Sequence, residues 1–331
     1  MVNVVTAIPK RNISEANQQK IRKVSPAINL QNATLWVCEE MEGNLSHQKE
    51  LDAMLGQADV LLARALPRNL IKRAPKLKWI QVTFAGMENI LIDKDLVESA
   101  VKLTNSSGIQ AAAISEYVIT LMLAFDKHLT AFAEQKKQKI WEPASMVGFS
   151  SQTVGILGLG SIGKEIAGRA RALGMHVIAY DRPRKLMRAK NVDKLVAGSD
   201  INQLLKESDF VVSCLPFAPK TIGIIGEKEL RMMKPTAYLI NVSRGQIVQE
   251  DALIRALKEK WIAGAGLDVF IREPLPADNP LWDLPNVIIS PHCSGYLEDN
   301  TDRVVDLFTV NLKRYIDGKR LLNIVDKKAG F

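Results

Sequence analysis

Short apolar runs rich in β-branched residues alternate with helical patterns along nearly all of this 331-residue chain. No tight hairpin turn separates successive runs, so the pattern predicts parallel strands joined by crossover helices. The runs are continuously apolar, which is typical of a sheet covered by helices on both faces. The predicted strands are residues 2–7, 34–38, 60–63, 78–84, 101–104, 153–157, 176–180, 210–213, 237–241, 263–267 and 287–290. The expected fold class is therefore α/β.

The alternation restarts after residue 150, which predicts two α/β units of roughly 150 residues each. Residues 111–125 form an apolar helical pattern, with Ile114, Val118, Met122 and Phe125 at helical spacing. Residues 302–316 form a last helical pattern after the second unit. A last helix could pack back on the first unit, so we expect the first domain to be discontinuous.

Composition and charge exclude several classes of protein. Lys and Arg number 44 against 36 Asp and Glu, and these basic residues are spread along the chain without interleaved aromatic residues. We therefore expect no nucleic-acid partner. No apolar stretch approaches the roughly 18 residues of a membrane span, so no membrane partner is expected either. The three cysteines lie far apart without metal-ligand spacing, which favours free thiols, no bound metal and a cytoplasmic location.

A glycine motif marks the start of the second unit. Residues 158–163 read Gly-Leu-Gly-Ser-Ile-Gly, directly between a predicted strand and a predicted helix. This context is the one in which such a motif binds a dinucleotide, because the pyrophosphate rests on free N–H groups at the start of the helix. The predicted contacts are Gly158, Gly160, Ser161, Ile162 and Gly163.

The residue at the end of the next strand indicates which dinucleotide binds. Asp181 follows Gly163 by 18 residues, where a carboxylate accepts hydrogen bonds from the adenosine ribose and repels a 2′-phosphate. We therefore expect NAD. Arg182, which we also expect to contact the cofactor, is followed by Arg184 and Lys185, and this basic cluster leaves NADP as an alternative.

Three polar residues lie on loops after the later strands of the same unit. Arg244 follows the strand ending at residue 241, Glu273 follows the strand ending at 267, and His292 follows the last strand. Open parallel sheets bind ligands beyond the carboxyl ends of their strands. A histidine can exchange a proton with a carbonyl oxygen, a carboxylate can orient it, and a guanidinium can bind a substrate carboxylate through two hydrogen bonds. The three residues are therefore the candidate catalytic group.

The chain resembles the D-isomer-specific 2-hydroxyacid dehydrogenase family. The resemblance is dense in GILGLGSIGKEIAGRARALGMHVIAYDR, MKPTAYLINVSRGQIVQEDALIRAL and GAGLDVFIREPLPADNPLWDLPNVIISPH. It implies a Rossmann cofactor domain, at residues 104–292, inserted in a flavodoxin-like substrate domain formed by residues 1–103 and 293–331. It also implies that Arg244, Glu273 and His292 act together, and that the protein forms a homodimer.

Other residues carry over by motif. In TFAGMENI, the backbone N–H groups of Ala85 and Gly86 match the family's loop for the substrate carboxylate, and Arg64 in LLARAL matches an arginine near the substrate. The cofactor is implied to contact Leu215, Pro216 and Thr221 in SCLPFAPKT, and Asp268 in GLDVF.

The expected function is thus an NAD-dependent D-2-hydroxyacid dehydrogenase, which also reduces small 2-keto acids. One alternative of another class remains open, because the corepressor-like proteins built on this scaffold bind NAD(H) as sensors and retain the same three residues. Turnover of a 2-keto acid would separate the enzyme from the binding protein.

Overall fold

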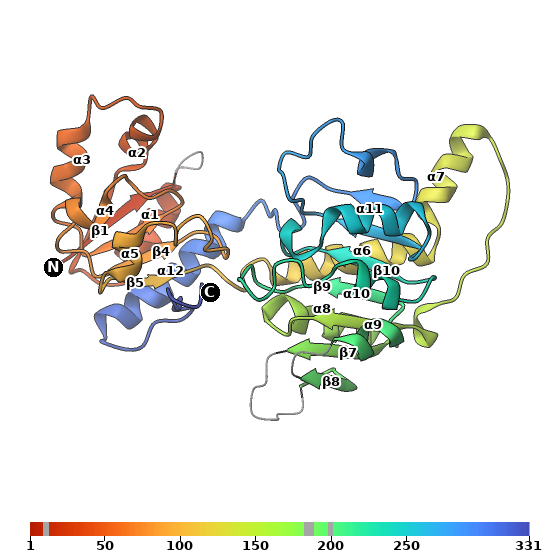
Figure 1. Cartoon of the computed structure of the whole chain (residues 1–331). Coiled ribbons are helices and arrows are strands. Elements are labelled where there is room, and N and C mark those ends of the chain that lie inside the picture. The colour runs from red at the N-terminus through yellow and green to blue at the C-terminus, as the bar shows by residue number, and fades with distance from the viewer. Residues whose placement is uncertain (9–12, 182–188, 198–200, 331) are drawn as a thin grey trace. The chain divides into compact units, whose positions relative to one another are not determined.

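The chain divides into two compact units in the computed structural model, which describes residues 1–8, 13–181, 189–197 and 201–330 (Figure 1). Unit 1 comprises Met1–Ile109 and Leu297–Phe331, and unit 2 comprises Gln110–Tyr296. The C-terminal helix α12 (Asn300–Ile316) packs within unit 1 against α1 (Glu15–Arg22), so both ends of the chain build one unit. Unit 2 is therefore an insertion in a discontinuous unit 1, as expected.

Unit 1 contains one parallel sheet in the order β2-β1-β3-β4-β5. This order is that of flavodoxin-like doubly wound folds, which confirms the fold class expected for this unit. Its remaining elements are β1 (Val2–Ala7), β2 (Ile28–Asn32), α2 (Thr34–Met41), α3 (Gln48–Leu55), β3 (Val60–Ala63), α4 (Leu70–Arg73), β4 (Trp79–Val82), α5 (Lys94–Glu98) and β5 (Lys102–Thr104).

Both faces of the unit 1 sheet are buried. Successive side chains of a strand point to opposite faces, so each strand contributes to two hydrophobic cores. Val5 and Leu61 face one hydrophobic core, which also contains residues of α2 and α3. Val4 and Trp79 face a second core shared with α1 and α12, where the Trp79 ring stacks on Phe308 at a centroid distance of 5.2 Å. The last helix thus completes one layer of the first unit.

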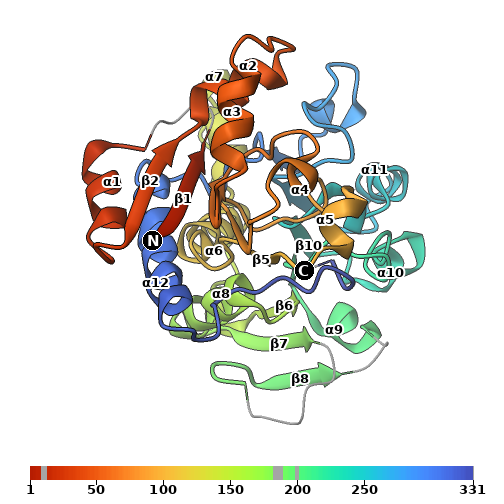
Figure 2. The same ribbon diagram turned by 90° about the vertical axis from the view of Figure 1, so that its left-hand side faces the viewer.

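Unit 2 contains a parallel sheet in the order β12-β11-β10-β9-β6-β7-β8. Renumbered within the unit this is the 3-2-1-4-5-6 order of a Rossmann fold with one further strand beside the sixth. Figure 2 shows β7 and β8 in succession at one edge of the sheet. The elements are α6 (Ala111–Asp126), α7 (Leu129–Gln138), β6 (Thr153–Leu157), α8 (Ser161–Ala172), β7 (His176–Asp181), β8 (Lys194–Ala197), α9 (Asn202–Glu207), β9 (Phe210–Ser213), α10 (Glu227–Met232), β10 (Tyr238–Asn241), α11 (Glu250–Lys258), β11 (Gly264–Leu267) and β12 (Val287–Ile289).

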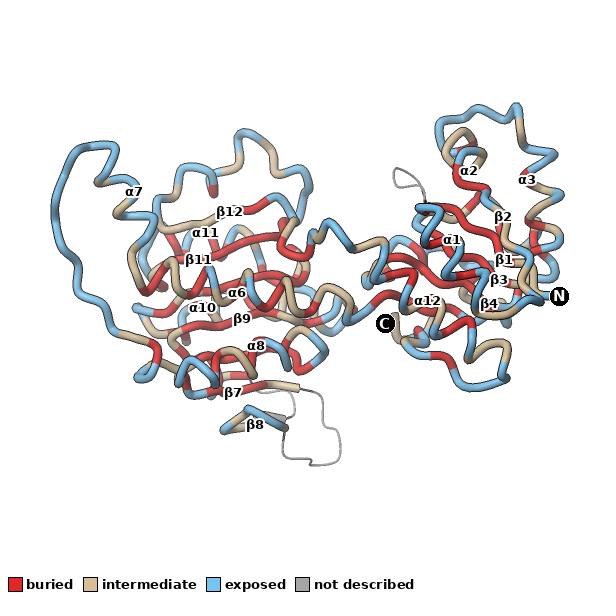
Figure 3. Tube along the Cα trace, turned by 180° about the vertical axis from the view of Figure 1, so that it is seen from behind, coloured by how far each residue is buried: buried red, intermediate tan, exposed pale blue. Residues whose placement is uncertain are grey.

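The unit 2 sheet is also covered on both faces. Ile156 and Val212 pack in a core with α6 and α8, whereas Val211 and Leu239 pack in a core with α9, α10 and α11. The strands are accordingly buried along most of their length, while α7 lies at the surface (Figure 3). Within the described residues no helix is long and apolar enough to cross a bilayer, and no group of side chains is arranged to hold a metal ion.

One predicted strand was wrong. Residues 34–38 belong to α2, and the strand of this region is β2, which precedes it. The run TLWVC is apolar throughout, so its period is ambiguous; in the structure Thr34 and Val37 are buried and Leu35 is exposed, as on a helix. The strand β2 was missed because it is a polar edge strand with no fully buried residue.

Candidate active site

The candidate residues of unit 2 follow the carboxyl ends of its parallel strands. Because all strands run in one direction, their carboxyl ends lie side by side at one end of the sheet. The motif starting at Gly158 follows β6, and Asp181 ends β7. Arg244 follows β10, and His292 follows β12. Residues distant in sequence are thus brought to one edge.

The glycine motif has the local geometry that a pyrophosphate site requires. Gly158 adopts φ +102°, and a Cβ there would lie 2.9 Å from the carbonyl oxygen of Cys214. At Gly163 a Cβ would lie 2.0 Å from the carbonyl oxygen of Gly158, so only glycine lets α8 start this close to the loop. A Cβ at Gly160 would meet nothing within 4 Å. The start of α8, at Ser161 and Ile162, is therefore open to an anion, and the residues fit the pyrophosphate of a dinucleotide.

The second loop predicted to contact the cofactor follows β9. The hydroxyl of Thr221 donates to the carbonyl oxygen of Pro216 at 2.7 Å and accepts from the N–H of Ala218 at 3.0 Å. This hydroxyl closes the loop on itself, with Leu215 buried and Pro216 exposed. Of the basic residues after Asp181, Arg182 lies outside the described residues.

The loop that carries Arg244 is held by buried polar groups after β10. Asn241 donates its side-chain N–H to the carbonyl oxygen of Arg244 at 2.9 Å and accepts from the N–H of Ser243 at 3.2 Å. The Ser243 hydroxyl lies 2.9 Å from that of Ser213 on the neighbouring strand β9. One guanidinium nitrogen of Arg244 donates to the carbonyl oxygen of Ser243 at 2.7 Å. The backbone of Arg244 and one guanidinium nitrogen are thus held by contacts within the loop itself.

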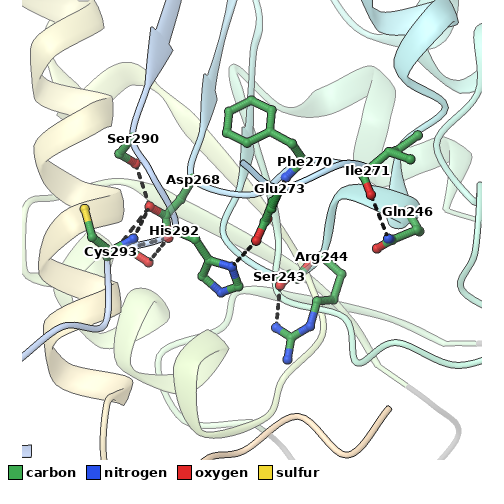
Figure 4. Close-up of polar contacts among 11 residues, drawn as sticks. Ser243, Arg244, Gln246, Asp268, Phe270, Ile271, Glu273, Ser290, His292 and Cys293 are labelled. Carbon is green, nitrogen blue, oxygen red and sulfur yellow. Dashed lines mark hydrogen bonds and ion pairs between the residues drawn. The ribbon is translucent and has the colours of Figure 1, made fainter. Parts of the chain in front are cut away.

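Close backbone packing joins the Arg244 loop to the loop after β11. A Cβ at Gly245 would lie 2.0 Å from the carbonyl carbon of Phe270, so the two loops touch only because residue 245 is glycine. Gln246 also donates to the carbonyl oxygen of Ile271 at 3.3 Å. The loop after β11 contains Glu273, so this contact brings the arginine and glutamate loops together (Figure 4).

Glu273 and His292 form the central pair of the site. Nδ1 of the imidazole lies 2.8 Å from one carboxylate oxygen of Glu273, and the other oxygen accepts from the N–H of Phe270 at 2.9 Å. Because Nδ1 faces the carboxylate, Nε2 is the ring nitrogen left to meet a ligand. In Figure 4 the imidazole and the Arg244 guanidinium both extend away from the strand ends, toward the lower part of the view. In this arrangement Nε2 of His292 can donate or accept a proton beside the positive charge of the Arg244 guanidinium.

The backbone of His292 is in the left-handed region, with φ +50°. That conformation is uncommon for a residue with a side chain and needs support from its surroundings. The support comes from Asp268, whose carboxylate accepts from the hydroxyl of Ser290 at 2.6 Å, from the N–H of Cys293 at 2.9 Å and from the N–H of Ser294 at 3.1 Å. Asp268 is only 1% exposed. It therefore holds the turn on both sides of the histidine, and its expected contact with the cofactor stays a prediction.

The same buried cluster includes a tyrosine of α6. Burial raises the pKa of Tyr117, and the nearby Asp268 carboxylate acts in the same direction, whereas a hydrogen bond with Ser290 opposes them. Burial also raises the pKa of the Cys293 thiol, again with Asp268 adding to the effect. Both groups are therefore neutral near pH 7.

The remaining predicted residues belong to unit 1. Arg64 follows β3, and Ala85 and Gly86 lie on the loop after β4. Strands β3 and β4 are neighbours, with Ala63 opposite Val82, so both segments leave the sheet at its carboxyl edge. This edge is where doubly wound sheets bind ligands.

Comparison with known proteins identifies the family. The family model for the D-isomer specific 2-hydroxyacid dehydrogenase, NAD binding domain, matches residues 119–294, which is more than half of the chain. The chain belongs to this family. Its members act on small 2-hydroxy and 2-keto acids, and the resemblance stated from the motifs is confirmed.

Individual relatives agree with this assignment. A glyoxylate reductase from Thermococcus litoralis is 37% identical over 292 residues, and the match covers 86% of each chain. A family protein from Aeromonas salmonicida has a TM-score of 0.80 at 31% identity, covering 98% of this chain and 99% of that one. An NADPH-dependent glyoxylate/hydroxypyruvate reductase from Sinorhizobium meliloti, in complex with NADP and sulfate, has a TM-score of 0.83 at 25% identity, covering 100% of both chains.

Sequence reasoning missed the buried polar residues that hold the loops. Asn241 and Ser243 were passed over, although both stand directly at the end of an apolar strand in INVSRG. A polar residue that is buried needs a hydrogen-bond partner, so polar residues at strand ends are a usable signal for loop anchors. Ser290 and Ser294 carry the same signal on either side of His292.

Replacing Glu273 tests whether the pair moves a proton. The carboxylate accepts from Nδ1 and so holds the ring with Nε2 free to exchange a proton with a carbonyl oxygen. In Glu273→Gln we expect slower reduction of a 2-keto acid and slower oxidation of the matching 2-hydroxy acid, because both directions pass the proton through Nε2. The Kd of NADH should stay unchanged. Initial rates in both directions, together with NADH fluorescence, provide the measurement.

The matched control is Glu207→Gln, which neutralises an exposed carboxylate just before β9, at the opposite edge of the same sheet. Both rates should match wild type in this variant. If a folded Glu273→Gln enzyme also keeps both rates, Glu273 does not act on the proton held by His292.

Proposed function

We propose that this protein is an NAD-dependent D-2-hydroxyacid dehydrogenase that reduces small 2-keto acids. The observation that carries the proposal is the 2.8 Å contact between His292 and Glu273, at the edge of the sheet that also presents the glycine motif and Arg244. Membership of the family supports the reaction class. The three cysteines are free thiols, which supports a reducing, cytoplasmic compartment.

Each residue of the pair has a distinct task in the proposed reaction. A bound nicotinamide dinucleotide supplies the hydride that reduces the carbonyl carbon. His292 donates the proton from Nε2 to the carbonyl oxygen, so that the keto group becomes a hydroxyl. Glu273 accepts from Nδ1, which fixes the ring orientation and stabilises the imidazolium before the transfer. In oxidation the same ring takes the proton back.

Arg244 is proposed to bind the substrate. A guanidinium presents parallel N–H donors that match the two oxygens of a carboxylate, and its positive charge also favours electron density on the adjacent carbonyl oxygen. Within unit 1, the backbone N–H groups of Ala85 and Gly86 are proposed to bind a substrate carboxylate, and Arg64 is proposed as a further substrate contact. A carboxylate held in this way defines the acid as a 2-keto or 2-hydroxy acid, because the reacting carbon is the one next to it.

The proposed substrate class is the smallest 2-keto acids. The relatives that match most of this chain include several glyoxylate reductases, among them those of Thermococcus litoralis and Korarchaeum cryptofilum. Glyoxylate and hydroxypyruvate are therefore the first substrates to assay, followed by pyruvate and phenylpyruvate to measure how the rate depends on side-chain size.

The assay that tests the function combines this panel with variants of Arg244. Wild type should oxidise NADH in the presence of at least one 2-keto acid. Arg244→Ala should lower kcat/KM by about 10²-fold or more, because a charged donor to the substrate is lost. Arg244→Lys should recover only part of the loss, since an ammonium keeps the charge without the two-pronged geometry. NADH binding by fluorescence should be unchanged in both.

Two outcomes would contradict the assignment. NADH binding without turnover of any acid in the panel would favour the sensor-like binding protein on this scaffold. Full activity in Arg244→Lys would exclude a two-pronged contact with the carboxylate.

We propose NAD as the preferred cofactor on the basis of Asp181. It ends β7 beside the glycine loop, whose Gly158 N–H donates to the carbonyl oxygen of Tyr180 at 2.8 Å, so the carboxylate follows directly on the pyrophosphate site. A carboxylate there favours ribose hydroxyls over a 2′-phosphate. The Sinorhizobium meliloti reductase is NADPH-dependent, so the family uses both cofactors and the choice needs a direct measurement.

Asp181→Ala tests this choice. Wild type should have the higher kcat/KM with NADH than with NADPH, and the variant should narrow that ratio by about 10-fold or more as the repulsion of the 2′-phosphate is removed. Steady-state kinetics with each cofactor at a fixed, saturating keto acid provide the ratio. A wild-type preference for NADPH would contradict the role given to Asp181 and assign the basic residues after it to the phosphate.

A homodimer formed through unit 2 is also proposed. Helix α7 has no buried residue, and it continues into a long exposed loop over residues 139–148 (Figure 1). We call α7 and this loop the arm. The arm carries several large apolar side chains that are exposed, namely Leu129, Ile140, Met146 and Val147, and Trp141 is 100% exposed. An exposed apolar group of this size is typical of a protein interface, and a second copy of the same arm is the simplest partner.

The dimer is tested by sedimentation or light scattering. Wild type should have twice the mass of the chain, and the double variant Trp141→Ser, Val147→Ser should shift toward the monomer at low micromolar concentration. The control is Trp282→Ser, because Trp282 is a half-exposed tryptophan elsewhere in unit 2. A monomeric wild type, or a double variant that stays dimeric, would exclude this interface.

A further inference from the structure

We propose that Asn105 positions the Ala85–Gly86 peptide for binding a carboxylate, and that Asn323 of the C-terminal segment holds Asn105 in place. The inference rests on the proposed function, which gives the substrate carboxylate to the N–H groups of Ala85 and Gly86. All four residues belong to unit 1, so the argument uses contacts within one compact unit.

Two consecutive carbonyl groups of the loop after β4 are tied to the segment after β5. The carbonyl oxygen of Phe84 accepts from the N–H of Ser106 at 3.0 Å, and that of Ala85 accepts from the side-chain N–H of Asn105 at 2.9 Å. In a trans peptide the C=O and the following N–H point in opposite directions. The N–H groups of Ala85 and Gly86 therefore both point away from residues 105–106.

These two N–H groups are available to a ligand. Within the described part of the chain neither has a hydrogen-bond acceptor, and Ala85 is exposed. Successive backbone N–H groups on one side of a turn can bind an anion. Two donors side by side match the two oxygens of a carboxylate.

The side-chain amide of Asn105 can take only one orientation. Its oxygen accepts from the N–H of Ser107 at 3.1 Å, so its nitrogen must face the carbonyl oxygen of Ala85. The residue is 8% exposed. Its main chain is held on both sides by Asn323, which accepts from the Asn105 N–H at 3.2 Å and donates its side-chain amide to the Asn105 carbonyl oxygen at 3.3 Å. The same amide of Asn323 donates to the carbonyl oxygen of Ser107 at 2.8 Å.

The C-terminal segment is itself fastened along β5. Ile324 forms an antiparallel bridge with Thr104, and the N–H of Val325 donates to the main chain of β5 at 2.9 Å. Further on, the ammonium of Lys327 donates to main-chain carbonyl oxygens between residues 96 and 101. Asn323 adopts φ +52°, a conformation that asparagine tolerates better than most residues. The segment therefore holds Asn323 against Asn105 as a fixed support.

The support of the Ala85–Gly86 peptide by Asn105 and Asn323 should affect carboxylate binding, and not only the stability of the fold. Without the Asn105 amide the Ala85–Gly86 peptide could rotate, and binding a carboxylate would then have to order it first. Asn105 and Asn323 are positioning residues, since they act through the Ala85 carbonyl and touch neither the carboxylate nor the cofactor. Their loss should weaken carboxylate binding and leave dinucleotide binding unchanged, because the glycine motif lies in unit 2.

The experiment compares Asn105→Ala and Asn323→Ala with wild type and with Asn29→Ala. Asn29 is the control because its exposed side-chain amide donates to Asn3 at 3.0 Å, at the amino end of the sheet. For each protein we would measure the Kd of NADH by fluorescence, the Kd of oxamate for the enzyme–NADH complex by calorimetry, and KM and kcat for glyoxylate. Thermal unfolding followed by circular dichroism reports whether each variant is folded.

We expect the Kd of oxamate and the KM of glyoxylate to rise by about tenfold in Asn105→Ala, the factor that the loss of one net hydrogen bond gives. The Kd of oxamate and the KM of glyoxylate should rise by about threefold in Asn323→Ala, since Asn323 acts only through Asn105. The Kd of NADH should be unchanged throughout, kcat should fall less than KM rises, and Asn29→Ala should match wild type.

The outcomes separate this inference from the proposed function. If wild type binds no oxamate and reduces no 2-keto acid, the proposed function fails and the inference fails with it. If wild type is active and a folded Asn105→Ala enzyme binds oxamate as tightly, the inference alone is overturned. Should Asn105→Ala not fold, Asn323→Ala decides, because its side chain is partly exposed: unchanged oxamate affinity there overturns the inference.

Discussion

The burial of both faces of two parallel sheets is the constraint on which the rest of this structure depends. A helix that crosses one face of a sheet between two strands carries the chain back to the end where the first strand began, so the two strands run in one direction. Every described strand pair is parallel. The carboxyl ends of all strands of a unit therefore lie at the same end of its sheet, so residues as distant as Gly158 and His292 lie at that end.

A second device recurs at these strand ends. A buried polar side chain near the start of a loop bonds the backbone of the residues that carry the chemistry. Asn241 holds the carbonyl of Arg244, Asp268 holds the turn around His292, and Asn105 holds the Ala85 carbonyl. Each anchor fixes the backbone conformation at or beside a residue proposed to act on the substrate. Loops need such anchors because, unlike strands, they have no regular ladder of hydrogen bonds.

Most of the elements could be predicted because their patterns are unambiguous. Val60–Ala63 and Phe210–Ser213 are buried along their whole length, and their predicted bounds were confirmed. The edge strands β2 and β8 were missed, because strands at an edge carry polar residues and contribute little to a core. Residues 34–38 were placed in a strand, since an apolar run of five residues has no readable period.

The sequence by itself determined the fold class, the insertion of one unit in the other, the family and the residue types of the candidate site. These follow from local patterns: strand–helix alternation, a glycine motif between a strand and a helix, and polar residues after apolar strands. Only the tertiary structure decided which groups meet around the expected pair of Glu273 and His292. The packing of Gly245 on Phe270 and the support of Asn105 by Asn323 join segments 25 and 218 residues apart. Such contacts depend on how loops pack at the sheet edge, and no local pattern encodes that packing.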